Sequence, residues 1–389
     1  MASLNPLMVA EEWQFPPGVT YLNHGSFGPP PRIVQASQAQ WRARMNANPM
    51  EFFDRVLEPA WFAARDILAK LVGASPDNLV FQENCTAAMN AVARSVIMRT
   101  GDEVLLTDHE YGAVVRIWQR KCQESGAHEP IIARLTTPFT TAQQVVDDIL
   151  AAITPRTTIV VLSHITSATA VTLPVAHITA AIRACHGERV IVVVDGPHAV
   201  AQLDLGLDAL DCDFYVASCH KWLCAPLGSG FLYAHPRWQA NLSAPILSWG
   251  RVPPAQPREP RDEFLWPGTR DHSPYLTIPA AIDFLGQTVG WSQFREYTFG
   301  LAAHAKERLT AIYGRPPLAP ATMEWCGTMA LVELPPGDAP PIKRALWEQY
   351  GIECPVLNWQ NRRFVRVSAH LYNTVDQIER LCAALSNLC

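Results

Sequence analysis

Two short apolar runs near the middle of this sequence each end in side chains that could do chemistry. Residues 190–194 predict a buried strand, and Asp195 follows it directly. Residues 214–217 predict another, followed by a hydroxyl, an imidazole and an amine, those of Ser218, His220 and Lys221. The two strand ends therefore offer a carboxylate and a lysine amine together. An apolar, glycine-bearing segment, residues 222–230, comes next and would partly desolvate the lysine, which makes its amine nucleophilic.

This pair of residues is what pyridoxal phosphate requires of a protein. Lys221 would form the Schiff base, and Asp195 would keep the pyridine nitrogen protonated. Ser218 and His220 could donate to the phosphate, and His198 could reach the phenolic oxygen. An isolated aspartate at a strand end more often organises a turn, so the prediction depends on the pair.

Three further segments could complete such a site. Thr86 and Ala87 open a predicted helix whose unpaired N–H groups would attract an anion, although an ordinary helix cap has the same pattern. Tyr111 follows another predicted strand and could stack on a flat ring, although such aromatics more often pack in the core. Arg366 lies in a predicted strand and could either face solvent or bind a carboxylate through two parallel hydrogen bonds.

Composition limits the classes of function. The chain has 389 residues, 49% of them hydrophobic and 17% charged, which is ordinary for a compact enzyme with two domains. A net charge of −5 without basic runs gives no reason to expect nucleic acid or a membrane as partner. The 10 cysteines show no metal-binding spacing and predict free thiols. Without a signal-peptide pattern or a long apolar run, we expect a cytoplasmic protein.

The order of predicted elements indicates an α/β fold with a second, smaller domain. Short apolar runs alternate with helical segments and predict a mostly parallel sheet covered on both faces, with strands at residues 79–82, 103–107, 130–133, 158–162, 190–194, 214–217 and 230–233. The later elements predict an α+β unit: long helices near 275–287 and 292–313, strands at 329–333 and 363–368, and helices at 341–350 and 375–388. We expect residues 21–285 to form the large domain, and residues 1–20 with 286–389 to form an N-terminal arm and the small domain.

The motifs resemble the class V aminotransferase family of fold-type I pyridoxal-phosphate enzymes. The strongest pieces are DGPHAVAQLDL from Asp195, SCHK from Ser218 and RVSAHLYNT from Arg366. The isopenicillin N epimerase-like subgroup is suggested by YLNHGSFG from Tyr21, NPMEFF, DHEYGA and WPGTRDHSPYLTIPAAI. The resemblance implies a large domain built on a mostly parallel seven-stranded sheet, with a smaller C-terminal α+β domain.

The resemblance also implies roles for single residues. Lys221 matches the Schiff-base lysine and Asp195 the partner of the pyridine nitrogen, while the other cofactor contacts are expected from His198, Thr86, Ala87, Tyr111, Ser167, Ser218 and His220. Arg366 matches the clamp for the substrate α-carboxylate, with Asn23 and His24 expected nearby. Thr269 matches a residue that reaches the phosphate of a neighbouring subunit, which implies a homodimer with shared active sites.

Two departures from related sequences bear on the chemistry. Cysteine desulfurases of this class carry a catalytic cysteine in the loop before the arginine strand, and Cys354 comes too early in the corresponding segment, residues 352–361. Desulfurase chemistry is therefore disfavoured. The segment 163–170 ends in Ala170 where the subgroup usually has glycine, so the loop that carries Ser167 could be shifted.

The reaction is less specified than the cofactor. We rank epimerisation, or β-elimination by a C–S lyase, on a sulfur-containing amino acid first, and a class V aminotransferase or a desulfurase-like activity lower. Epimerisation needs a second acid, for which His24, His272 and Tyr275 are candidates by motif position only, and a structural role is favoured for each. A catalytically inactive, cofactor-binding regulatory relative is the alternative outside enzymes, and the presence of Lys221, Asp195 and Arg366 together disfavours it.

Overall fold

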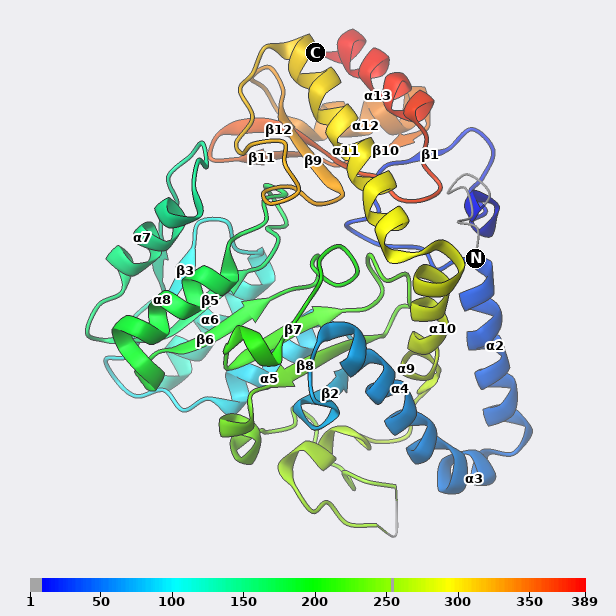
Figure 1. Ribbon diagram of the computed structural model, residues 1–389, viewed down its shortest axis with the longest axis vertical. Helices are drawn as coiled ribbons and strands as arrows, with labels where there is room; N and C mark the ends of the chain where they lie inside the picture. The colour runs from blue at the N-terminus through cyan, green and yellow to red at the C-terminus, as the bar shows by residue number, and fades with distance from the viewer. Residues whose placement is uncertain (1–8, 253–254) are drawn as a thin grey trace.

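A seven-stranded sheet forms the centre of the computed structural model, which describes residues 9–252 and 255–389 (Figure 1). The first eight residues of the expected N-terminal arm, and residues 253–254 of the proline-rich stretch, lie outside the described residues. The strands follow the order β2 (Leu79–Gln82), β8 (Gly230–Ala234), β7 (Phe214–Ser218), β6 (Ile191–Asp195), β5 (Thr157–Ser163), β3 (Glu103–Thr107) and β4 (Ile131–Ala133). β8 runs antiparallel to both of its neighbours, β2 and β7, and the other pairings in this sheet are parallel. All seven predicted strands are confirmed to within one residue at each end.

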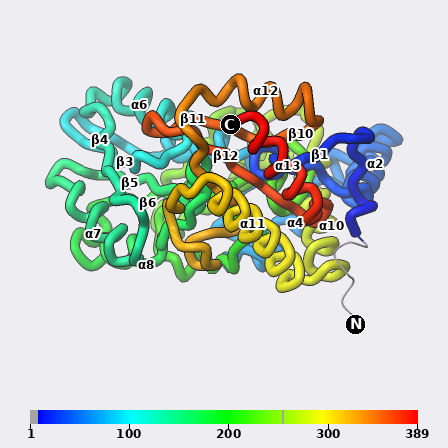
Figure 2. Tube along the Cα trace, turned by 90° about the horizontal axis from the view of Figure 1, so that it is seen from above, coloured from blue at the N-terminus to red at the C-terminus, as the bar shows by residue number. Residues whose placement is uncertain are grey.

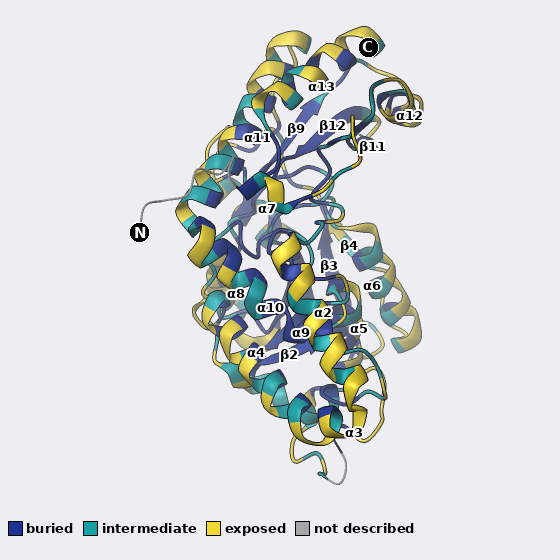
Figure 3. Ribbon diagram, turned by 90° about the vertical axis from the view of Figure 1, so that its right-hand side faces the viewer, coloured by how far each residue is buried: buried dark blue, intermediate teal, exposed yellow. Residues whose placement is uncertain are grey.

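Helices cover both faces of this sheet, which is why its strands are continuous apolar runs. On one face, Val193 of β6 packs in a cluster with α5 (Cys85–Ser95) and α6 (Gly112–Ser125). On the other, Val192 and Val194 belong to a cluster with α4 (Leu57–Val72), α7 (Ala142–Ala152) and α8 (Val175–His186). Figure 3 shows the buried strands between helices whose outer faces are exposed.

A smaller unit stands at the carboxyl end of the chain. Its antiparallel sheet has the order β11 (Val356–Trp359), β12 (Arg362–Ser368) and β9 (Met329–Glu333). The helices α11 (Trp291–Tyr313), α12 (Ala339–Tyr350) and α13 (Val375–Leu388) pack around it (Figure 2). The unit has its own core cluster, and Leu22, which was expected in the large domain, belongs to it. The N-terminal arm therefore continues past residue 20, and the bounds of the two domains stay a prediction.

The N-terminal arm reaches this smaller unit through a short parallel pairing. Strand β1 (Thr20–Tyr21) pairs with β10 (Ile352–Glu353), and an isolated bridge joins Asn23 to Ser368. The arm is therefore fixed beside the end of β12, the strand that carries Arg366. The arm leads into α2 (Arg32–Ala47), which is followed by the short α3 (Pro49–Glu51).

Two predictions about single elements were wrong. The expected long helix near residues 275–287 is broken into α9 (Ser273–Leu276), α10 (Ile278–Asp283) and a π-helical turn at Phe284–Val289. Pro279 explains the break, because it lacks an N–H and its ring clashes with the preceding turn. The segment expected as a loop around Cys354 instead forms β10 and β11, and its turn places Gln360 and Asn361 at positive φ.

Within residues 9–252 and 255–389, no helix is both long enough and apolar enough to cross a bilayer.

Candidate active site

A cavity of about 680 Å³ opens where the carboxyl ends of the parallel strands face the smaller unit. Nine of the side chains expected at the cofactor or substrate border it: Thr86, Tyr111, Ser167, Asp195, His198, Ser218, His220, Lys221 and Arg366. They come from segments scattered over the chain, and the sheet edge collects them. This is the position at which open α/β sheets bind ligands.

Asp195 is held rigidly at the end of β6. It pairs in register with Ser163 of β5 and with Val216 of β7. Gly196 must follow, because a β-carbon there would lie 2.1 Å from the ring of Tyr215. Burial raises the pKa of Asp195 to about 6, while a hydrogen bond from Cys85 and the charge of Lys221 oppose this shift.

The thiol of Cys85 donates to Asp195 Oδ1 over 2.7 Å, a contact that the sequence analysis missed. The two residues lie 110 positions apart, and no spacing rule connects them. Burial raises the pKa of Cys85 far above its ordinary value, so the sulfur keeps its proton and acts as a donor. Cys85 therefore helps to fix the orientation of the aspartate.

Lys221 follows β7 and reaches into the cavity. Its Nζ lies 3.2 Å from His198 Nε2. Burial lowers the pKa of the lysine to about 8, although Asp195 and Cys85 act in the opposite direction. A larger fraction of the amine is therefore neutral near physiological pH than for an exposed lysine, as a nucleophile or general base requires.

The proton on His198 can be placed from its hydrogen bonds. The indole of Trp222 donates to His198 Nδ1 over 3.1 Å, and an indole N–H can only donate. Burial lowers the pKa of His198 far below its ordinary value, so the ring is neutral. Its single proton therefore sits on Nε2, which faces Lys221.

The start of α5 and the turn after β7 meet at one end of the cavity. Asn84 caps the helix, and the backbone N–H of Cys85 donates to Ser218 Oγ over 3.0 Å. His220 Nδ1 is buried without a hydrogen-bond partner among the described residues. Together with Thr86, these groups offer donors and a helix start to an anion.

The prediction for Ala87 does not fit this arrangement. Its backbone N–H donates to the capping side chain of Asn84 over 2.9 Å, and the residue borders a second, smaller cavity. The cap thus occupies the group that was expected to bind phosphate. A helix start offers several unpaired N–H groups, and the sequence could not reveal which one the cap would take.

Arg366 enters the cavity from β12 and is only 5% exposed. It donates to Ser26 Oγ over 3.0 Å and to the carbonyl of Ser167, with Ser167 Oγ at 3.4 Å. Its Nε has no partner among the described residues. The guanidinium is therefore held in place with a donor still free, and the alternative of a solvent-facing arginine is excluded. Ser26 was missed in the sequence analysis.

The predictions for Asn23 and His24 were wrong, because neither residue borders the cavity. Asn23 is 8% exposed and donates to Glu353 over 3.4 Å, and His24 is fully buried behind Lys221. The bridge between Asn23 and Ser368 turns the arm so that the next residues, Gly25, Ser26 and Phe27, face the cavity instead.

The other candidates for a second acid also lie outside this cavity. His272 is fully buried, and Tyr275 stacks on Phe81 with ring centroids 5.0 Å apart beside the smaller cavity. Both contribute to packing of the large unit. Tyr111, in contrast, borders the main cavity and is 51% exposed.

Two further residues named from the resemblance lie away from the cavity. Thr269 is exposed on the surface. Cys354 is buried, with its sulfur 3.6 Å from the carbonyl of Arg366, and burial raises its pKa well above the ordinary value. A buried, protonated thiol is a poor nucleophile, which agrees with the prediction against desulfurase chemistry.

This combination of sheet, cavity and smaller unit defines a fold-type I pyridoxal-phosphate enzyme. The model of the aminotransferase class-V family matches residues 21–381, and the chain belongs to that family. The resemblance stated from the motifs is thereby confirmed.

Similar proteins support the same assignment. The isopenicillin N epimerase of Amycolatopsis lactamdurans is 39% identical over 404 residues, covering 98% of this chain and 100% of that protein. The isopenicillin N epimerase of Streptomyces clavuligerus is 37% identical over 384 residues, covering 96% and 95%. The apo structure of a cysteine desulfurase from Thermococcus onnurineus NA1 has a TM-score of 0.83 at 20% identity, covering 100% of this chain and 99% of that one, and shares the fold.

Pyridoxal 5'-phosphate is the cofactor of this enzyme family, and the residues of the cavity fit it. The amine of Lys221, whose pKa is lowered, lies beside the imidazole N–H of His198, and the buried carboxylate of Asp195 borders the same cavity. The unpartnered buried nitrogen of His220 lies with the hydroxyl of Ser218 at the end where the helix start would attract an anion. Lys221, Asp195 and His198 would hold the ring, and Ser218, His220 and Thr86 would hold the phosphate.

Proposed function

We propose that this enzyme inverts the α-carbon of a carboxylate-bearing amino acid, a reaction of the kind for which the two isopenicillin N epimerases above are named. The observation that carries the proposal is the pairing of a lowered-pKa Lys221 with a buried, partly unpartnered Arg366 in one cavity. The Lys221 amine would remove the α-proton of the substrate, and the Arg366 guanidinium would bind its carboxylate. The agreement over the full length with two epimerases supports this choice among the reactions of the family.

The roles of the side chains follow from their contacts. Arg366, held by Ser26 and Ser167, would bind the substrate carboxylate and fix the α-carbon near Lys221. The neutral amine of Lys221 would then take the α-proton. Bound pyridoxal phosphate supplies the electron sink for the charge left at that carbon. Asp195 would keep the ring nitrogen protonated, and Nε2–H of His198 would donate to the phenolic oxygen.

The role of Arg366 can be tested by removing its guanidinium. For Arg366→Leu we expect KM for an amino acid to rise by about 100-fold, in line with the loss of a charge-assisted bidentate contact of about 1.5–3 kcal/mol. Turnover of an amino-acid amide, which lacks the carboxylate, should change little. Steady-state kinetics on the acid and its amide make the measurement. An equal loss for both substrates would contradict the assigned role.

Inversion also requires an acid that returns a proton from the other side. Tyr111, the residue directly before α6, borders the cavity, is titratable and makes no recorded side-chain hydrogen bond with the described residues. We assign it the second acid in place of His24, His272 and Tyr275. Its ring would also stack on the cofactor, as the resemblance implies.

The variant Tyr111→Phe separates these two roles, because it keeps the ring and removes the hydroxyl. We expect inversion to fall by about 100-fold, the usual contribution of a general acid. Exchange of the α-proton with solvent, which needs only Lys221, should fall far less. Chiral chromatography and proton NMR in heavy water measure the two rates. Loss of both rates in parallel would argue against a separate acid at Tyr111.

A C–S lyase is the second candidate, and one observation favours it. Three of the side chains considered as a second acid lie outside the cavity, and β-elimination needs only one base and a leaving group. Release of pyruvate from a cysteine conjugate would identify this activity. An aminotransferase would instead consume an α-keto acid, and a regulatory relative would bind the cofactor without turnover of any amino acid.

We also propose a homodimer with shared active sites. Ile246, Leu247 and Trp249 are 57%, 65% and 55% exposed, an apolar patch that a partner would cover. A bridge between Gly250 and Trp266 links this segment to the one that carries exposed Thr269. Thr269 could therefore reach the phosphate of a second chain. Sedimentation equilibrium should give about twice the chain mass of 43.1 kDa, and a single-chain mass would contradict the proposal.

The state of the thiols bears on the compartment. All 10 cysteines are free in the structure, and eight of them are buried. This supports a reducing compartment, and we propose the cytoplasm. Blocking of thiols in freshly lysed cells, followed by mass spectrometry, would detect any disulfide and so contradict the proposal.

A further inference from the structure

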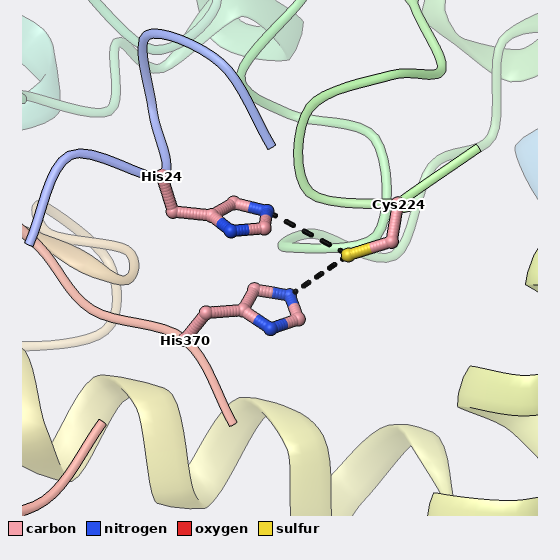
Figure 4. A group of neighbouring side chains, drawn as sticks. All are labelled: His24, Cys224 and His370. Carbon is pink, nitrogen blue, oxygen red and sulfur yellow. Dashed lines mark hydrogen bonds between the residues drawn. The ribbon is translucent and has the colours of Figure 1, made fainter. Parts of the chain in front are cut away.

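Three buried side chains meet behind Lys221, on the side away from the cavity. They are His24 of the N-terminal arm, Cys224 of the loop after β7, and His370 after β12 (Figure 4). Each is 0% exposed. The sulfur lies 3.6 Å from His24 Nε2 and 3.5 Å from His370 Nε2. Distant segments of the chain thus converge on the turn that carries the lysine.

The hydrogen bonds of His24 fix its proton. Nε2 lies 3.1 Å from the backbone carbonyl of Lys221, which can only accept, so Nε2 must carry a proton. Nδ1 lies 2.9 Å from the hydroxyl of Tyr372, which then donates to it. Burial lowers the pKa of His24 to about 3, so the ring holds a single proton at any ordinary pH. The Nε2–H of His24 therefore donates a hydrogen bond to the Lys221 carbonyl.

The same carbonyl closes a tight turn. The backbone N–H of Cys224 donates to it over 2.9 Å, and Cys224 adopts a φ of 59°, which L-residues rarely do. Such a conformation persists only where the surroundings enforce it. Gly28 presses on the same point, since a β-carbon there would lie 2.5 Å from the Lys221 carbonyl oxygen and 2.6 Å from His24 Nε2. His24 and Gly28 of the arm therefore hold the turn at residues 221–224 in its conformation.

We propose that His24 is a positioning residue: its Nε2–H fixes the Lys221 carbonyl and so aims the lysine amine into the cavity. Tyr372 connects this contact to the C-terminal segment, 348 residues away in the sequence. The inference rests on Lys221 being the lysine that carries the cofactor, and it holds for any reaction the enzyme catalyses.

A metal ion is the competing explanation of the cluster, since two imidazoles and a thiol are typical zinc ligands. The structure favours hydrogen bonding. The rings of His24 and His370 are stacked, with centroids 3.9 Å apart and planes 15° apart, and ligands in two nearly parallel planes are poorly arranged to meet at one ion. Binding an ion through His24 Nε2 would also break the bond to Lys221.

The test compares two substitutions of His24 in the holoenzyme. Leucine in His24→Leu removes the donor, whereas glutamine in His24→Gln can donate to Lys221 and accept from Tyr372. We expect His24→Leu to lower kcat by about 100-fold, the effect of misplacing a catalytic group by about 1 Å, with a smaller change in KM. It should also shift the pH midpoint of the cofactor's visible absorbance. His24→Gln should restore most of both.

Controls make the outcome decisive. His177→Gln, on the exposed face of α8, should behave as the wild type. Tyr372→Phe, which removes only the hydroxyl, should shift the pH midpoint of the visible absorbance in the same direction as His24→Leu. This variant replaces His24→Leu in the test if His24→Leu does not fold. The proposal is overturned if His24→Leu keeps the kcat and the pH midpoint of the wild type, or if His24→Gln loses as much kcat as His24→Leu. It is also overturned if the purified wild type contains one metal ion per chain. The absorbance shift does not depend on the substrate, so it remains informative even if the enzyme is not an epimerase.

Discussion

Replacement of Lys221 by alanine should abolish turnover, with a loss of about 10⁴-fold or more, because one side chain carries both the covalent attachment and the base. Borohydride treatment should fix the cofactor to the wild-type chain and leave the Lys221→Ala chain unlabelled. The fold should persist, because Lys221 makes its recorded side-chain contact only with His198. Intact-mass spectrometry after reduction makes the measurement.

The matched control removes an exposed lysine. Lys70→Ala, on the surface of α4, should keep full activity and full labelling. Labelling of the Lys221→Ala chain at another lysine, with activity retained, would show that the assigned residue is wrong.

The second large effect is expected for Asp195→Asn, which keeps the shape of the side chain and removes its charge. Asp195 is the residue that would keep the ring nitrogen of bound pyridoxal phosphate protonated, so its neutral replacement would weaken the electron sink that the cofactor supplies. We expect turnover to fall by about 10³-fold, the upper range for a single electrostatic contact. Lys221 is unchanged, so borohydride should still fix the cofactor. Activity assays and mass spectrometry on the same sample provide both readings.

Asp204→Asn is the control for this change, because the Asp204 side chain is 93% exposed and pairs with Arg295 at the surface. It should leave activity unchanged. Retention of more than a tenth of wild-type turnover in Asp195→Asn would contradict the role given to the carboxylate.

The large sheet could be predicted closely from the sequence. Strands such as β6 are covered on both faces, so they are unbroken runs of valine and isoleucine that few other elements contain. The ends of these strands carry Asp195, Ser218 and Lys221, and once the strands were placed the site largely followed. Side chains attached to regular elements are the ones whose location a pattern predicts.

The predictions failed where position depends on contacts between distant segments. His24 and Asn23 are adjacent to cavity residues in sequence, but the bridge from Asn23 to Ser368 directs them away. The same limit hid the contacts of Cys85 with Asp195 and of Ser26 with Arg366. No local periodicity encodes such pairs, because they depend on how the arm and the two units pack.

The most direct test of the central claim incubates the holoenzyme in heavy water with a panel of amino acids, including cysteine conjugates and their sulfoxides. Proton NMR follows the α-proton, chiral chromatography follows inversion, and a coupled assay follows pyruvate. The account predicts exchange of the α-proton with inversion and without pyruvate. Pyruvate release without inversion would instead make the enzyme a C–S lyase, and a protein that takes up no pyridoxal phosphate would contradict the account as a whole.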